Sequence, residues 1–194
     1  MKRKLLVIDF ETGGLNPETD ALCSLAAVVL NEGFIDEVYY SLIRDHDGNL
    51  DPEAMAVNGL LPQELARAKN AAEVVEDLEQ MFLRHDMRLP RRIVLTGHNV
   101  LFDIGFMKRL YRLAGAEFDV RFERRYCDTM AAGHVLEQAG RLDFQGPPSL
   151  DNLCRTLGVP LNREGGHHSK EDAVATAKCW SKMVAMMRFH GSTV

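Results

Sequence analysis

Residues 5–14 read LLVIDFETGG, an apolar run that ends in two carboxylates and a pair of glycines. A short apolar run followed by turn residues predicts a buried strand, here over residues 4–10. Because successive side chains of a strand point to opposite faces, Asp9 and Glu11 are expected on the same face at its carboxyl end. An Asp at the end of a strand is often only a turn former. Whether Asp9 and Glu11 have a chemical role depends on which other reactive side chains are expected near them.

The order of the expected elements defines a fold class. Three strands come first as an antiparallel meander, with Glu32-Gly33 as the hairpin signal between the second and the third. Helices and short strands then alternate, which predicts a mixed α/β sheet flanked by helices in one domain over residues 1–194. The expected strands cover residues 4–10, 22–31, 34–43 and 92–97, with a brief one near 126–127. The expected helices cover residues 71–84, 100–114, 129–139, a segment capped by Ser149 that runs to 157, and 169–188, with a loop over 140–148.

Composition limits the class of protein and its surroundings. Hydrophobic residues make up 46% and charged residues 26% of the 194-residue chain, as in a globular protein. No apolar run approaches the ~18 residues of a membrane span. The four cysteines are scattered, which favours reduced thiols and a cytoplasmic location without membrane contact. A net charge of −5 argues against broad electrostatic attraction to nucleic acid. Basic residues nevertheless concentrate in three clusters, at 88–92, 108–112 and 121–125.

More polar side chains of a reactive kind follow other element ends. They lie in the segments GHNVLFD and GGHHSKED and comprise His98, Asn99, Asp103, His167, His168 and Asp172. Ligand sites in open α/β sheets gather at the carboxyl ends of strands, so these side chains are expected near Asp9 and Glu11. Clustered carboxylates repel one another without cations, and oxygen ligands suit Mg²⁺ or Mn²⁺. Four carboxylates and a histidine therefore predict a site for two divalent cations.

Three motifs occur in a familiar order: DFETGGL (9–15), HNVLFD (98–103) and HHSKED (167–172). Together they resemble the DEDDh 3′–5′ exonucleases, the DnaQ-like or RNase T family of the ribonuclease H-like fold, from residue 5 to about 180. The resemblance implies that Asp9, Glu11 and Asp172 hold one metal ion. Asp9 would bridge to a second ion supported by Asp103, and His167, five residues before Asp172, would be the general base.

The same resemblance suggests contacts with the end of the substrate. The expected substrate-binding residues are Phe10, Thr12, Gly13, Gly14, Leu15, Asn58, Leu60, His98, Asn99 and Phe102. Two positions depart from the family pattern. Gly13 stands where many members have a second Thr, and Ser169 stands where a small apolar residue is common.

The sequence thus predicts a metal-dependent exonuclease that releases nucleoside 5′-monophosphates from single-stranded 3′ ends, with DNA favoured over RNA. RNA 3′-end trimming, hydrolysis of short oligonucleotides, and an inactive nucleic-acid-binding module are the alternatives. A polymerase or another protein is a candidate partner. The oligomeric state stays open.

Overall fold

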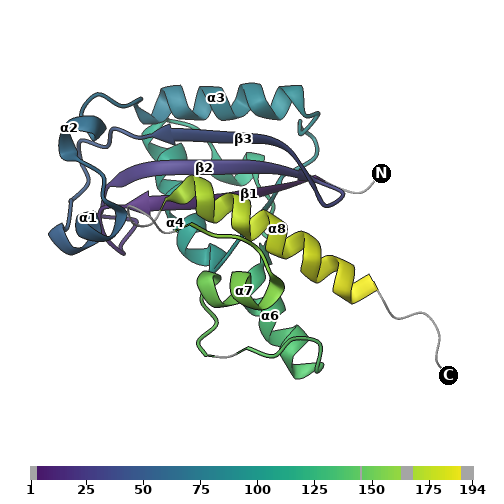
Figure 1. The fold of residues 1–194 in the computed structure, drawn as a ribbon. Coiled ribbons are helices and arrows are strands. Elements are labelled where there is room, and N and C mark those ends of the chain that lie inside the picture. The colour runs from purple at the N-terminus through teal and green to yellow at the C-terminus, as the bar shows by residue number, and fades with distance from the viewer. Residues whose placement is uncertain (1–3, 145, 163–167, 189–194) are drawn as a thin grey trace.

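The computed structural model describes residues 4–144, 146–162 and 168–188 and shows a mixed sheet with helices on both faces (Figure 1). The strands are β1 (Leu5–Thr12), β2 (Leu22–Asn31), β3 (Phe34–Leu42), β4 (Val94–Gly97) and β5 (Cys127–Asp128). The helices are α1 (Pro52–Asn58), α2 (Pro62–Leu65), α3 (Ala71–Arg84), α4 (Val100–Leu113), α5 (Phe118–Arg121), α6 (Thr129–Gln138), α7 (Leu150–Leu157) and α8 (Ser169–Arg188). The predicted fold class is confirmed.

The five strands lie in the order β3-β2-β1-β4-β5. The first three form the antiparallel meander, whose β2–β3 turn uses positive φ angles at Glu32 and Gly33. β4 pairs with β1 in parallel, and β5 pairs with β4 in parallel. β1 runs two residues further than predicted, so Glu11, like Asp9, lies within the strand. A bulge follows at Glu11/Thr12, the kind of irregularity that re-aims side chains next to active sites.

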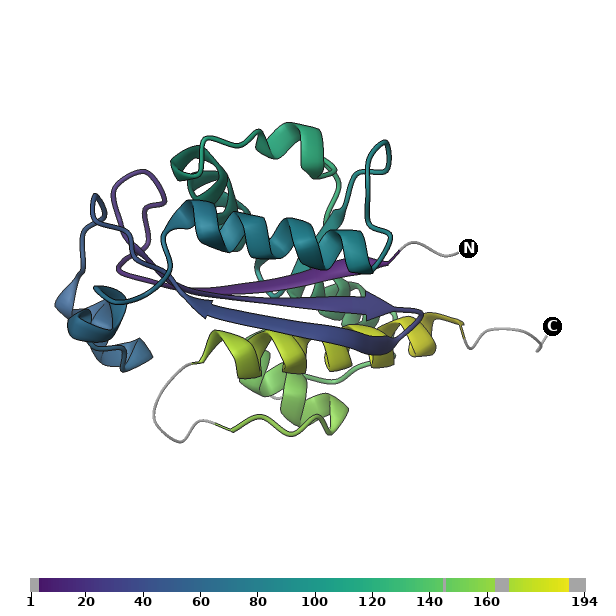
Figure 2. The same ribbon diagram turned by 90° about the horizontal axis from the view of Figure 1, so that it is seen from above.

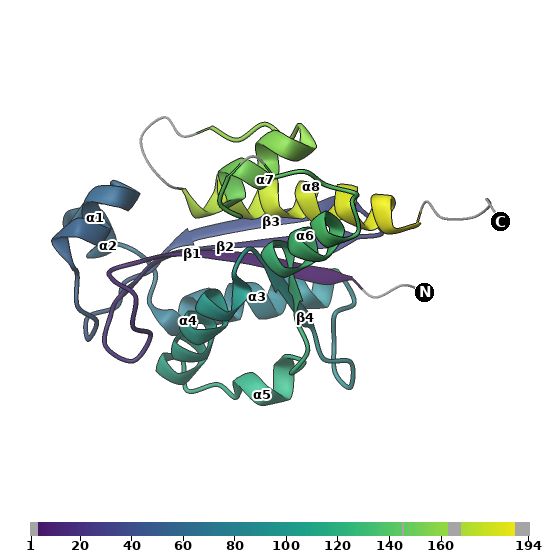
Figure 3. The ribbon, with the colours of Figure 1, turned by 90° about the horizontal axis from the view of Figure 1, so that it is seen from below.

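The two faces of the sheet bury different helices, as the views from above and below show (Figures 2 and 3). Leu6, Ile8 and Phe10 of β1 enter the main core with α3 and α4. Val7 points to the other face and packs against α8. Strand alternation then places Asp9 and Glu11 on the α8 face as well.

Small side chains bring α8 close to the sheet. Ala173 and Ala177 of α8 are fully buried against Ala26 and Val28 of β2. Because these residues are short, the helix backbone approaches the strands closely. This approach carries Asp172, the neighbour of Ala173, onto the same face as Asp9.

The first turn of α4 fills the space beyond the end of β4. A Cβ on Gly97 would lie 2.7 Å from a methyl of Val100, so glycine allows the chain to turn directly from β4 into α4. β4 ends before it could pair with Phe10 of β1. The Asp103 carboxylate accepts the Phe10 backbone N–H instead, at 3.0 Å. The short length of β4 therefore brings Asp103 to the edge of β1.

Three short helices, α1, α2 and α5, lie outside the helices that periodicity predicts. They have only four to seven residues, too few for a helical periodicity to appear in the sequence. α1 does carry a local start signal, since the Asp51 side chain accepts from the Glu53 N–H and Pro52 occupies the first turn. Among the described helices, none combines the length and the apolar character that a bilayer crossing requires.

Candidate active site

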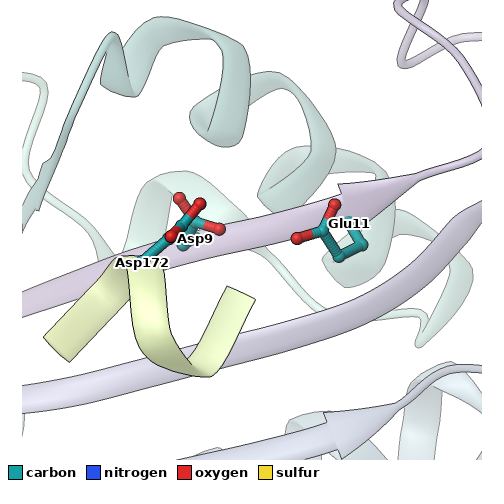
Figure 4. Close-up of side chains that lie close together, drawn as sticks. All are labelled: Asp9, Glu11 and Asp172. Atoms are coloured by element: carbon teal, nitrogen blue, oxygen red, sulfur yellow. The ribbon is translucent and has the colours of Figure 1, made fainter. Parts of the chain in front are cut away.

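Three carboxylates converge where α8 begins to cross β1 (Figure 4). Asp9 and Glu11 come from β1 and Asp172 from the first turn of α8, and their nearest oxygens all lie within 4.8 Å of one another. Asp172 is buried, whereas Asp9 and Glu11 are half-buried. Three acidic side chains this close repel one another, and a divalent cation removes that repulsion. The donor set is all oxygen, which suits Mg²⁺ or Mn²⁺.

Asp103 lies beside this group but outside the 4.8 Å cluster. Burial raises the pKa of the Asp103 carboxyl well above its usual range, and the nearby charges of Glu11 and Asp128 raise it further. The hydrogen bond from the Phe10 backbone N–H opposes this shift. Asp103 is thus electrostatically coupled to the cluster while its side chain is anchored to β1.

Asp128 is a positioning residue that the sequence reasoning missed. Its carboxylate accepts the backbone N–H groups of Asn99 and Val100 at the start of α4, at 3.2 and 3.0 Å. It also accepts the N–H of Met130 at 2.8 Å at the start of α6. One side chain therefore joins two helix N-termini and fixes the turn that carries Asp103. Its N-cap position before Thr129 was the available signal.

Steric contacts within the protein require glycine at both positions of the Gly13-Gly14 turn. A Cβ on Gly13 would collide with the backbone oxygen of Asn49, and a Cβ on Gly14 with the Asp20 carboxylate. The Thr12 hydroxyl closes the turn by donating to the Gly14 carbonyl at 2.6 Å. Both glycines are buried. Their predicted contact with substrate remains a prediction.

A buried ion pair supports the loop that follows this turn. Arg109 of α4 donates to both carboxylate oxygens of Asp45, at 2.8 and 3.2 Å, and to the Glu18 carbonyl at 3.0 Å. Arg109 is only 4% exposed. Since breaking a buried pair strands a charge, this contact holds the loop bearing Leu15 firmly against α4.

The other residues expected to contact substrate differ in how far they are exposed to solvent. Leu15 is 83% exposed and Leu60 is partly exposed, so both side chains are accessible. Phe102 is partly buried and packs on Phe106, with ring centroids 5.0 Å apart. Asn58 is 1% exposed: its amide donates to the Thr12 carbonyl at 3.3 Å and its oxygen accepts the Leu60 N–H at 3.0 Å. Asn58 therefore ties α1 to the end of β1.

His98 and Asn99 connect the end of β4 to its surroundings. One His98 ring nitrogen lies 2.9 Å from the Thr129 hydroxyl and the other 3.0 Å from the Pro148 carbonyl. Burial lowers the pKa of His98, which favours the neutral ring. Asn99 is exposed with a left-handed backbone, φ 57°. His98 links the site to the loop 140–148, for which the sequence offered no role.

His167 lies outside the described residues. His168 is partly exposed, and its carbonyl accepts the Asp172 N–H at 3.0 Å, which closes the first turn of α8. The backbone of His168 is thus tied directly to a carboxylate residue of the cluster.

Two of the three basic clusters lie side by side. A parallel bridge joins Ile93 to Phe122, so the segments 88–92 and 121–125 are neighbours. They lie at the start of β4, where Val94 pairs with Leu5, about 13 Å along β1 from Asp9. In the 108–112 cluster, Arg109 is buried and Arg112 pairs with Glu18 at 2.7 Å.

Comparisons with known proteins agree with this geometry. The Exonuclease family profile, of the RNase T type, matches residues 6–180. Ribonuclease T of Yersinia enterocolitica is 30% identical over 92% of this chain and 83% of its own. The PolC-type DNA polymerase III of Thermotoga petrophila is 27% identical over 97% of this chain, which spans only 12% of that polymerase.

Solved structures share the fold. Exonuclease I of E. coli in complex with a dT13 oligonucleotide superposes with a TM-score of 0.76 at 18% identity, over 94% of this chain and 41% of that one. A zinc-bound form of the same protein with single-stranded DNA gives a TM-score of 0.75 at 18% identity, over 96% and 41%.

The chain therefore belongs to the Exonuclease family of the RNase T type. It is a DnaQ-like 3′–5′ exonuclease, a hydrolase of phosphodiester bonds, as the three motifs predicted.

We predict that Asp9→Asn keeps the fold and loses the response to metal. Removing one charge relieves repulsion in the cluster, so the melting temperature in EDTA should stay equal or rise. Wild-type protein with Mn²⁺ at 100 times its Kd should gain about 2.7 kcal/mol of stability, and Asp9→Asn should gain far less at the same concentration. Thermal unfolding with and without Mn²⁺ measures both effects.

Asp119→Asn is the matched control, because Asp119 is an exposed acid on α5, away from the cluster. It should respond to Mn²⁺ like the wild type. Equal stabilisation of Asp9→Asn and the wild type would mean that the ion binds elsewhere.

Proposed function

We propose that this chain removes nucleotides one at a time from single-stranded 3′ ends, in a reaction that depends on two divalent cations. Nucleoside 5′-monophosphates are the product. The observation that carries this proposal is the convergence of Asp9, Glu11 and Asp172 within 4.8 Å on one face of β1. A carboxylate cluster of this kind suits hydrolysis of a phosphodiester, whose transition state gathers negative charge on its oxygens.

The side chains present fit the ions that the proposal requires. Asp9, Glu11 and Asp172 would hold the first ion, and Asp9 with Asp103 would hold the second. Mg²⁺ or Mn²⁺ bound there supplies an activated water and charge stabilisation at the leaving 3′-oxygen. Asp103 interacts electrostatically with Glu11 and has one oxygen already engaged by the Phe10 N–H, which supports an outer role for it, through water.

His167 is the proposed general base. A neutral imidazole is well matched to taking a proton from the attacking water near pH 7. The family resemblance places this base five residues before Asp172, in the segment that leads into α8. The described neighbour His168 has its carbonyl bound to the Asp172 N–H, which fixes the backbone of His168 relative to the cluster.

The terminal nucleotide would lie against the Gly13-Gly14 turn. Leu15, exposed beside that turn, offers an apolar surface to a base. Phe10, Thr12 and Asn58 would act behind it, because they shape β1 and the turn rather than face solvent. Leu60, Asn99 and Phe102 complete the proposed contacts around the end of the strand, with His98 holding the loop at Pro148.

Relatives support both nucleic acids as substrates. Exonuclease I bound to dT13 and the PolC-type polymerase favour DNA, the preference predicted from the sequence. The Ribonuclease T relative, which matches along most of its own length, favours RNA trimming. Discrimination depends on whether the site contacts the 2′-hydroxyl. We retain DNA as the predicted preference and RNA 3′-end trimming as the second candidate.

Other readings of the site are weaker. An inactive binding module would not need the carboxylate cluster, and a short-oligonucleotide phosphodiesterase would not need contacts beyond two nucleotides. The paired basic segments at 88–92 and 121–125 offer contacts to a longer strand. A polymerase or another protein remains a candidate partner. The cytoplasm is the predicted location, and the oligomeric state stays open.

We expect 3′ to 5′ digestion of single strands in Mg²⁺. DNA and RNA of one sequence, each labelled at the 5′ end, should shorten progressively from the 3′ end. A 3′-phosphate should block both, because the terminal sugar packs against the Gly13-Gly14 turn. Equal digestion of blocked and free ends would remove the polarity claim, and a faster rate on RNA would reverse the predicted preference.

The two adjacent histidines provide a test of the proposed base. His167→Ala should lower the single-turnover rate about 10²–10⁴-fold and flatten the low-pH limb of its pH profile. His168→Ala should lose much less, because its side chain points away from the attacking water in this assignment. A larger loss at His168 would shift the assignment by one residue.

A further inference from the structure

Two buried serines join α8 to the sheet next to the carboxylate cluster. Ser24 of β2 and Ser169, the first residue of α8, are both 0% exposed, and their hydroxyl oxygens lie 2.8 Å apart. Ser24 is the partner of Glu11 in the β1–β2 ladder. Ser169 lies three residues before Asp172. The hydrogen bond therefore connects the two elements that supply the cluster.

The contact between α8 and β2 repeats along both elements. Ser169, Ala173 and Ala177 follow one another at intervals of four residues and face Ser24, Ala26 and Val28, which follow at intervals of two. Four residues of helix rise about 6 Å and two residues of strand about 6.6 Å, so the two series stay in step. All three positions on the helix are small.

A periodic contact of small residues does not define one register. If α8 slid along β2 by one turn, Ala173, Ala177 and Ser181 would take the positions of Ser169, Ala173 and Ala177, and each position would still hold a small side chain. The slide would move Asp172 by about 5.4 Å, out of reach of Asp9 and Glu11. The hydrogen bond between Ser24 and Ser169 favours one register. The slide would separate the two hydroxyls and leave the buried Ser24 hydroxyl without Ser169.

We propose that the Ser24–Ser169 hydrogen bond is a positioning device that sets the register of α8 and so places Asp172 at the metal site. The inference rests on the metal site proposed above and adds residues that touch neither metal nor substrate.

The α8 helix offers a matched control for this pair. Ser181 donates its hydroxyl to the Gly33 carbonyl of the β2–β3 turn at 3.0 Å, twelve residues along the helix from Ser169. Ser181→Ala removes a contact between α8 and the sheet far from the carboxylates. A merely stabilising role would make Ser169→Ala and Ser181→Ala alike in their metal affinity.

Calorimetric titration with Mn²⁺ tests the proposal on the whole chain. One internal hydrogen bond shifts an equilibrium by about three- to tenfold, so Ser169→Ala and Ser24→Ala should each weaken the apparent Mn²⁺ affinity by that factor. The double variant Ser24→Ala/Ser169→Ala should lose no more than either single variant, because both disrupt the same bond. Ser181→Ala should stay within about twofold of the wild type.

Ser169→Ala is the cleaner of the two single variants, because Ser24 also neighbours the Tyr40 hydroxyl of β3. The double variant leaves no buried hydroxyl of the pair unpaired, so it keeps the test valid if a single variant fails to fold. Unfolding in EDTA, measured in parallel, separates stability from metal affinity.

The outcomes separate this inference from the function on which it rests. A wild-type protein that does not bind Mn²⁺ would contradict the metal site itself. If the wild type binds Mn²⁺ and Ser169→Ala binds it with equal affinity, only the positioning role is overturned. An equal loss in Ser181→Ala, or additive losses in the double variant, would also overturn it.

Discussion

Repulsion among three clustered carboxylates is the constraint on which the site depends. Asp9, Glu11 and Asp172 approach within 4.8 Å, a separation at which ionised acids repel one another. The rest of the structure has to hold these charges together before any ion arrives. The apolar cores on both faces of the sheet provide that rigidity, since β1 and α8 are anchored in them on each side of the cluster.

The supporting contacts come from segments far apart in the sequence. Asp128 fixes the N-terminus of α4, and α4 in turn carries Asp103 to the Phe10 N–H. Arg109 of the same helix holds the loop after the Gly13-Gly14 turn through Asp45 and the Glu18 carbonyl. α4 thus serves both the carboxylates and the turn. A single helix therefore positions residues of the proposed metal site and of the proposed substrate contact.

Local signals made much of this architecture predictable from the sequence. Strand parity alone places Asp9 and Glu11 on one face, and the side-chain cap at Ser149 marks the start of α7. The three motifs also identify the family from the sequence alone. The extension of β1 to Thr12 was missed, because Glu11 and Thr12 are polar and the apolar run stops at Phe10.

Contacts between distant segments were not predictable in the same way. The segment that leaves no room for a Cβ on Gly13 is the loop at Asn49, 36 residues along the chain. Both ends of the Asn58 amide bind backbone groups, those of Thr12 and Leu60. The predicted substrate contacts of both residues stay predictions. Such roles depend on which chain segment arrives beside the residue, which no local pattern encodes.

Location of a bound ion is the most direct test of the central claim. Crystals of the protein soaked in Mn²⁺ and measured at the manganese absorption edge would reveal the ion by its anomalous signal. The account predicts a peak bordered by the carboxylates of Asp9, Glu11 and Asp172, at about 2.0–2.2 Å from their oxygens. A peak at another group of residues, with this cluster left empty at saturating Mn²⁺, would contradict it.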